Sequence, residues 1–229
     1  MPGHFCSMTT SHPSLGSARR SAALTMIVGA TLLVSSCATG GDGPGAGGAA
    51  PDAPVGYSLG SLAPGLPDGE VVGTGTVLDR GGDAELCLGP VAESAPPQCE
   101  GIPLVGWDWT GLDGQTTMGD ATWGAYAVQG TYDRASFTVT QPPILLALYD
   151  PMAPEDPTGG VACDTDEATL LEIQAELPDR LGADYFASYP DNGHLWVDVA
   201  WDDGTWQKAA DDDFGEGTVI IRSALREVG

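Results

Sequence analysis

The chain has 229 residues, with 32 acidic against eight basic side chains and a formal charge of −24 at neutral pH. This negative charge repels nucleic-acid phosphates and anionic lipid headgroups, so we expect no nucleic-acid partner. It favours solubility, cations and basic partners.

The first 36 residues have the composition of a secretory signal peptide. They contain no acidic side chain, carry Arg19 and Arg20, and then run apolar from Ala22 to Val34. A membrane-spanning helix needs roughly 20 apolar residues, and this run is clearly shorter. The pattern therefore predicts a cleaved signal rather than a permanent membrane helix.

The segment Val34-Ser35-Ser36-Cys37 resembles the lipobox of bacterial lipoproteins, with an aliphatic residue, two small residues and a cysteine. The resemblance implies that Cys37 carries a diacylglyceryl group and begins the mature chain. Two acyl chains suffice for stable anchoring. We therefore expect a lipoprotein that is held at the extracytoplasmic face of the cell membrane by palmitate-type acyl chains on Cys37. The alternative is an ordinary signal peptide cut nearby. Loss of Arg19 and Arg20 with the signal lowers the formal charge to −26.

Residues 37–69 are dominated by Gly, Ala and Pro, which predicts a flexible tether after the lipid. Gly56–Gly60 matches the G-x-S-x-G pattern of serine hydrolases. Pro54 and Pro64 are incompatible with the strand and helix that must flank such a serine, so we predict no catalytic residue there.

Residues 70–143 carry β-type signals, with one predicted hairpin over 70–88 and a second over 123–140. Several short strands with internal glycines predict a small curved β-sheet or OB-like β-barrel. Five prolines between residues 141 and 160 indicate a linker over 144–162.

Residues 163–229 form the second predicted domain. A helix with apolar Leu170, Ile173 and Leu177, ended or interrupted by Pro178, precedes a hairpin around residues 190–193. A second helix and a closing strand follow. The order α-β-β-α-β predicts a ferredoxin-like sandwich, and the fold class of the whole chain is α+β.

Cysteines outside the cytoplasm favour disulfides, and Cys87 and Cys99 flank a Pro-rich loop that a bridge between them would close. Cys163 either stays outside this bridge or replaces one of its two members. His194, the one histidine of the mature chain, follows a turn, and we expect it at the surface without a role.

Two sets of side chains are candidate binding groups. The first set is Trp107, Trp109, Trp201 and Trp206. These tryptophans would form a partner site if they were exposed, whereas burial would make them core residues. Weak candidates for oxygen ligation of calcium are Asp202, Asp203, Asp211 and Asp213. None fits the calcium-loop pattern, so we predict no metal site. We also predict no cofactor.

Segments 75–78, 84–94, 106–109, 123–126 and 189–225 resemble uncharacterised secreted proteins and lipoproteins of high-GC Gram-positive bacteria, and this resemblance implies no activity. We expect a lipid-anchored cell-envelope protein with a binding or protein-interaction role and no enzymatic activity. Its partners would be the membrane, through Cys37, and another envelope protein or a cation. The alternatives are an envelope hydrolase acting on polysaccharide or peptide, and a calcium-dependent adhesion or sensing module.

Overall fold

The computed structural model describes residues 57–151 and 156–228. The predicted signal peptide, the lipidation site at Cys37 and the first part of the tether lie outside these residues. No helix within the described ranges is long and apolar enough to cross a membrane.

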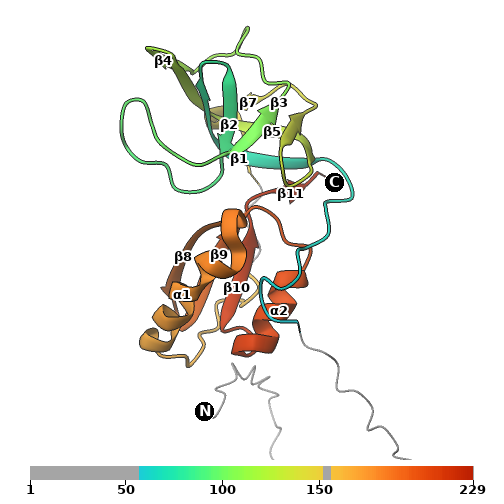
Figure 1. Cartoon of the computed structure of the whole chain (residues 1–229), viewed down its shortest axis with the longest axis vertical. Helices are drawn as coiled ribbons and strands as arrows, with labels where there is room; N and C mark the ends of the chain where they lie inside the picture. The colour runs from blue at the N-terminus through green and yellow to red at the C-terminus, as the bar shows by residue number, and fades with distance from the viewer. Residues whose placement is uncertain (1–56, 152–155, 229) are drawn as a thin grey trace, which may run out of the picture. The chain divides into compact units, whose positions relative to one another are not determined.

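The first half of the body is a five-stranded sheet that closes on itself (Figure 1). Its strands are β1 (Val71–Arg80), β2 (Asp83–Cys87), β3 (Ile102–Val105), β5 (Ala121–Tyr132) and β6 (Phe137–Val139). The neighbour order is β1-β2-β3-β6-β5, and β5 returns to pair antiparallel with all ten residues of β1. The β3–β6 pair is parallel. The predicted small barrel-like sheet is therefore confirmed.

Glycines inside the strands permit close backbone approach within the barrel. A Cβ at Gly75 would collide with the Cys87 carbonyl, and one at Gly130 with the Thr138 carbonyl. Only glycine fits where another backbone comes this near, as the sequence pattern predicts. Alternate strand residues such as Val71, Val128 and Phe137 point inward and are buried.

Three short strands extend the barrel sheet. β4 (Thr116–Met118) and β7 (Ile144–Leu145) pair with β5, and β11 (Arg226–Glu227) pairs with β1. The 3-10 turn η1 (Leu146–Leu148) follows β7. The N-terminal end of the predicted 144–162 linker is thus part of the sheet.

The second half has the predicted element order α-β-β-α-β. Its elements are α1 (Glu167–Leu181), the 3-10 turn η2 (Gly182–Asp184), β8 (Tyr185–Asp191), β9 (His194–Val199), α2 (Thr205–Phe214) and β10 (Val219–Ser223). Asp166 caps α1 by accepting a hydrogen bond from Thr169 N at 3.1 Å. The predicted helical face is confirmed, because Leu170, Ile173 and Leu177 are buried. Pro178 does not end α1, since in the last turn its missing N–H removes a single hydrogen bond.

The three strands of this half lie in the order β10-β9-β8, with β8 antiparallel and β10 parallel to β9. Both helices contribute to the core on one sheet face, which β9 lines with Leu195, Val197 and Val199 (Figure 1). The ferredoxin-like arrangement is not confirmed. In that fold another strand separates the two strands joined by a helix, whereas β9 and β10 pair directly.

The outer edge of β10 is covered by the side-chain amide of Gln207 on α2. Its nitrogen donates to Val219 O at 2.9 Å, and its oxygen accepts from Ile221 N at 2.8 Å. The amide thus occupies the positions that an additional strand would take. Covering an edge in this way limits strand addition by other chains.

The cysteine and histidine predictions have different outcomes. Cys87 and Cys99 form the predicted disulfide, and Cys163 lies outside that bridge with its Sγ 3.2 Å from Thr165 Oγ1. The predicted exposure of His194 is wrong. The ring is buried, with Nδ1 2.6 Å from Gly217 O and Nε2 2.8 Å from Val161 O. The segment before α1 folds back over the start of β9, which the local turn sequence does not reveal.

Candidate functional site

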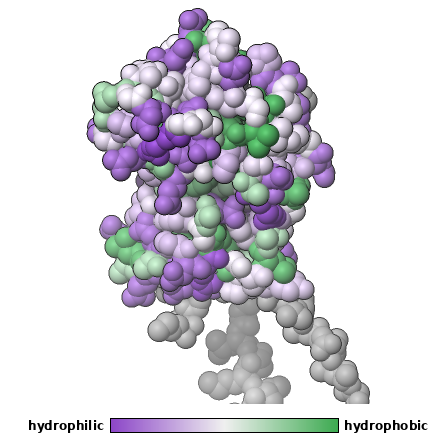
Figure 2. Space-filling view, turned by 45° about the horizontal axis from the view of Figure 1, so that its top comes forward, coloured by the Kyte–Doolittle hydropathy of each residue, from purple (hydrophilic) through white to green (hydrophobic). Residues whose placement is uncertain are grey.

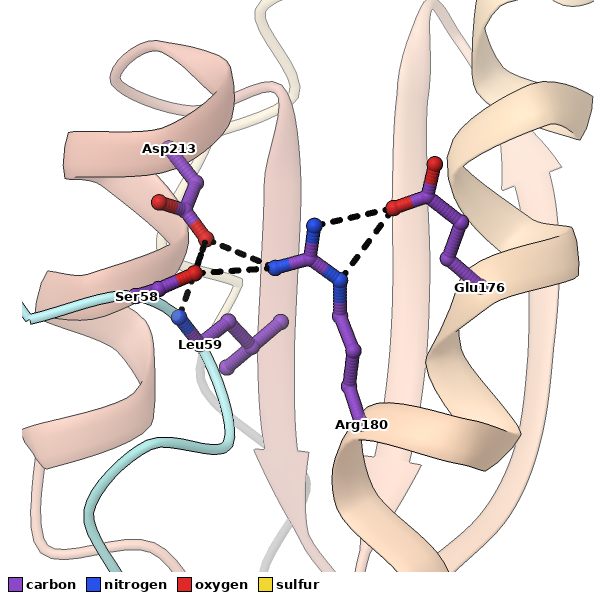
Figure 3. Close-up of polar contacts among 5 residues, drawn as sticks. All are labelled: Ser58, Leu59, Glu176, Arg180 and Asp213. Atoms are coloured by element: carbon purple, nitrogen blue, oxygen red, sulfur yellow. Dashed lines mark hydrogen bonds and ion pairs between the residues drawn. The ribbon is translucent and has the colours of Figure 1, made fainter.

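Residues Tyr57–Leu66, here called the strap, are fixed to the helices of the second half. Ser58 Oγ and Leu59 N both donate to Asp213 Oδ2, at 2.8 and 2.9 Å. Figure 3 shows Arg180 between Asp213 and Glu176, with 2.9 Å contacts to both carboxylates. The Leu59 side chain is only 3% exposed and belongs to the core beneath the helices.

These contacts correct the predicted tether boundary at residue 69, because the strap is already part of the folded body. Compositional reasoning failed here because one leucine and a few backbone groups are sufficient to dock the segment. Ser58, the serine of the G-x-S-x-G match, is held by Asp213 and Arg180. Its hydroxyl donates to a carboxylate and accepts from a guanidinium, so its role here is structural.

Two of the predicted binding tryptophans hold the same strap. Trp206 Nε1 donates to Leu62 O at 2.8 Å, and Trp201 Nε1 donates to Gly65 O at 3.0 Å. Asp203 Oδ2 accepts from Gly65 N at 2.7 Å. These indole groups are therefore engaged by the chain itself.

The other two tryptophans pack on the barrel core. The rings of Trp107 and Trp109 meet edge to face with centroids 5.1 Å apart, and Trp107 lies 5.4 Å from the buried Tyr126. Trp109 Nε1 donates to Asp79 Oδ2 at 2.9 Å. The loop between β3 and β4 thus covers the core with aromatic rings, and the structure does not gather the four tryptophans into one surface.

The candidate calcium ligands are each occupied by different N–H donors. Asp202 accepts from Trp206 N and Gln207 N, and Asp211 accepts from the Gln207 amide and Gly217 N. Burial raises the pKa of Asp202, although the hydrogen bonds that Asp202 accepts from Trp206 N, Gln207 N and Gly204 N oppose this rise. Among the residues that the structure describes, the one group of three close ligand atoms is Glu85, Cys87 and Cys99, and its cysteines form the disulfide.

The strongest candidate site is a groove on the outer wall of the barrel, here called the barrel groove, with a volume of about 280 Å³. Its floor is Val72 on β1 with Ala127 and Gln129 on β5, which the β1–β5 register places next to one another. One wall is the segment containing β7, through Pro142, Ile144 and Tyr149. The other is the C-terminal tail beyond β1, through Glu227 and Val228.

Large apolar side chains around the barrel groove are exposed. Ile144 on one wall is 46% exposed, and Val228 on the other is 42% exposed. Figure 2 shows that apolar patches interrupt a surface that is otherwise largely hydrophilic. Exposed apolar side chains on both walls of one groove make it a candidate contact surface.

Carboxylates outnumber basic groups beside the barrel groove. Glu70 is bonded to the groove residue Gln129, whose Nε2 donates to Glu70 Oε2 at 2.6 Å. Hydrogen bonds from Thr140 and Gln129 lower the pKa of Glu70, which favours its charged form. Glu227 lines the groove, Asp150 follows Tyr149, and Arg226, opposite Val72, is the neighbouring basic residue.

Sequence reasoning missed this groove because its floor joins strands more than fifty residues apart in the chain. One local signal existed. The apolar run Ile144–Leu148, in which Ile144 and Leu148 are exposed, lies within a proline-rich segment, where apolar residues are unexpected.

Comparison with known proteins finds no matching family model, no matching curated protein and no matching solved structure.

Proposed function

We propose that the protein is a lipid-anchored cell-envelope protein, non-enzymatic, whose folded body binds another molecule at the barrel groove. The observation that carries the binding role is the exposed apolar rim of that groove on a strongly acidic chain. Removing the exposed isoleucine and valine side chains of the rim from water against a partner lowers the free energy of the system. The proposed anchor is the lipid on Cys37.

The strap supports the anchoring part of the proposal. It joins the folded body to the tether that would carry the lipid, and its contacts with Asp213, Trp201 and Trp206 are made by helix α2 and the loop before it. The strap would thus connect the folded body to the proposed lipid anchor through the tether.

The strand order supports an OB-like type for the barrel. Numbered along the chain, its five strands pair in the order 1-2-3-5-4 and close between 4 and 1, with 3 and 5 parallel. This is the strand order of the OB-fold, a barrel that serves many proteins as a binding module. Fold likeness alone does not identify a ligand.

The two alternative functions have less support. Hydrolysis of a glycoside needs two facing carboxylates. A wide depression of about 840 Å³ beside the disulfide loop includes one glutamate, Glu100, with Arg80, whose guanidinium is paired with Glu85 at 3.4 Å. For calcium, the candidate aspartates already accept hydrogen bonds from separate N–H groups.

The anchor is tested by the intact mass of the protein purified from membranes of its native host. We expect the mass of residues 37–229 plus a diacylglyceryl group. Cys37→Ser should move the protein from the membrane fraction to the medium or leave it as unprocessed precursor. The control, Cys6→Ser, removes a cysteine within the predicted signal and should change neither result. An unmodified mass, or membrane retention of processed Cys37→Ser, would refute the lipid anchor.

A further inference from the structure

We propose that the barrel groove receives a short segment of another protein, in which one or two large apolar side chains are flanked by lysine or arginine. This inference deepens the proposed function and rests on it. It is argued from the size of the groove, its exposed apolar rim and the charges around it.

The small volume and open shape of the groove together favour inserted side chains over an enclosed small molecule. Sites for drug-sized ligands usually have volumes of about 300–1,000 Å³ and enclose most of the ligand. The barrel groove has about 280 Å³ and is open along the barrel wall between β7 and the C-terminal tail. That space suits one or two large side chains inserted from a chain that continues beyond both ends.

The chemistry of the groove favours an apolar anchor. Val72 and Ala127 form an apolar floor, and Ile144 and Pro142 extend it along one wall. Gln129 is the polar group of the floor, and its amide nitrogen is already bonded to Glu70. An inserted leucine or aromatic ring would therefore contact carbon atoms on three sides.

The surrounding charges select basic flanks and disfavour a second copy of this chain. Glu227 lines the groove and Glu70 is bonded to the groove residue Gln129, while Asp150 follows the groove residue Tyr149 in the chain and Arg226 precedes Glu227. Two copies would also bring together mature chains that each carry a formal charge of −26. A lysine or arginine next to the inserted side chain would instead meet carboxylates at the rim, which speeds and orients association.

The test uses the full lipidated chain in discs of phosphatidylcholine, which has no net charge and does not attract basic peptides. Three fluorescent hexapeptides serve as probes. The first has Leu-Tyr at its centre and lysine at the four flanking positions. The second replaces Leu-Tyr with Ser-Ser, and the third keeps Leu-Tyr but has glutamate at the four flanking positions. Fluorescence anisotropy gives the dissociation constants. We expect the lysine-flanked Leu-Tyr peptide to bind at least about tenfold more tightly than either of the others.

Matched variants locate the site. Ile144 on the groove wall is 46% exposed and Leu171 on α1 is 47% exposed, so serine at either position should leave the fold intact. Ile144→Ser should weaken the lysine-flanked Leu-Tyr peptide at least about fivefold, and Leu171→Ser should leave its affinity unchanged. Glu227→Gln should weaken the same peptide, whereas Glu172→Gln on α1 should not.

Two results would overturn the groove proposal. One is equal binding of the Leu-Tyr and Ser-Ser peptides, or no binding of either up to about 1 mM. The other is equal loss of affinity in Ile144→Ser and Leu171→Ser. Neither result affects the lipid anchor, which the mass measurement tests separately, so the two failures can be told apart.

Discussion

Replacing Leu59 with alanine should destabilise the folded body, because this side chain fixes the strap to the core. Leu59 is 3% exposed and packs within the cluster formed by α1, α2 and the three-stranded sheet. The lost methyl and methylene groups are worth about 2 kcal/mol, and a rigid cavity can raise the cost to about 5 kcal/mol. The strap is a single segment that can shift into the space, so we expect about 2–3 kcal/mol.

The assay is urea denaturation followed by tryptophan fluorescence, combined with hydrogen exchange of the strap amides. Leu59 N and Gly65 N donate to Asp213 and Asp203, and both amides should exchange faster in Leu59→Ala. Leu62→Ala is the control, since Leu62 lies in the same strap but is 42% exposed, and it should cost less than about 0.5 kcal/mol. If both variants cost the same, Leu59 does not fix the strap.

Three further perturbations follow from the structure. Replacing Cys87 and Cys99 with serine removes a crosslink across 12 residues and should lower the unfolding free energy by about 3 kcal/mol in urea, and unchanged stability would contradict this. A backbone hydrogen bond from Thr169 lowers the pKa of Asp166 in the folded state below its unfolded value of 3.8. The Asp166 carboxylate therefore stabilises α1 fully above pH 3.8, and this stabilisation is lost as the pH falls through the folded-state pKa. Circular dichroism of Asp166→Asn should show a weaker acid transition, and an identical acid transition would argue against the cap. Gln207→Leu uncovers the edge of β10 and should lower the unfolding free energy by about 1–3 kcal/mol. The exposed edge should also promote self-association, which size-exclusion chromatography detects. A monomer of full stability would show that the edge needs no cover.

Elements whose information is local were predicted well. The helical spacing of Leu170, Ile173 and Leu177 placed α1, because burial of every third or fourth residue follows from the helix period. The turn at residues 190–193 placed the β8–β9 hairpin. The Cys87–Cys99 bridge was predictable from its short separation and the proline-rich loop between the two cysteines.

Features that depend on distant contacts were predicted poorly. The composition of residues 57–66 indicates a tether, yet Leu59 lies in a core formed by residues more than a hundred positions away. His194 follows a turn, but its burial depends on carbonyls of residues 161 and 217. The pairing of β9 with β10 likewise decided the sheet topology, since the element order α-β-β-α-β fits more than one arrangement.

By itself the sequence determined the α-β-β-α-β order of the second half, the acidic composition and the glycines that a curved sheet requires, and it favoured the Cys87–Cys99 disulfide. It also predicts a lipid anchor at Cys37. These properties depend on neighbouring residues or on composition. Only the tertiary structure decided that Trp201, Trp206 and the four candidate aspartates bind the chain's own backbone. It alone also decided that Val72, Ala127 and Ile144 share a groove. The reason is physical: strand register and core packing bring together residues that have no relation along the chain.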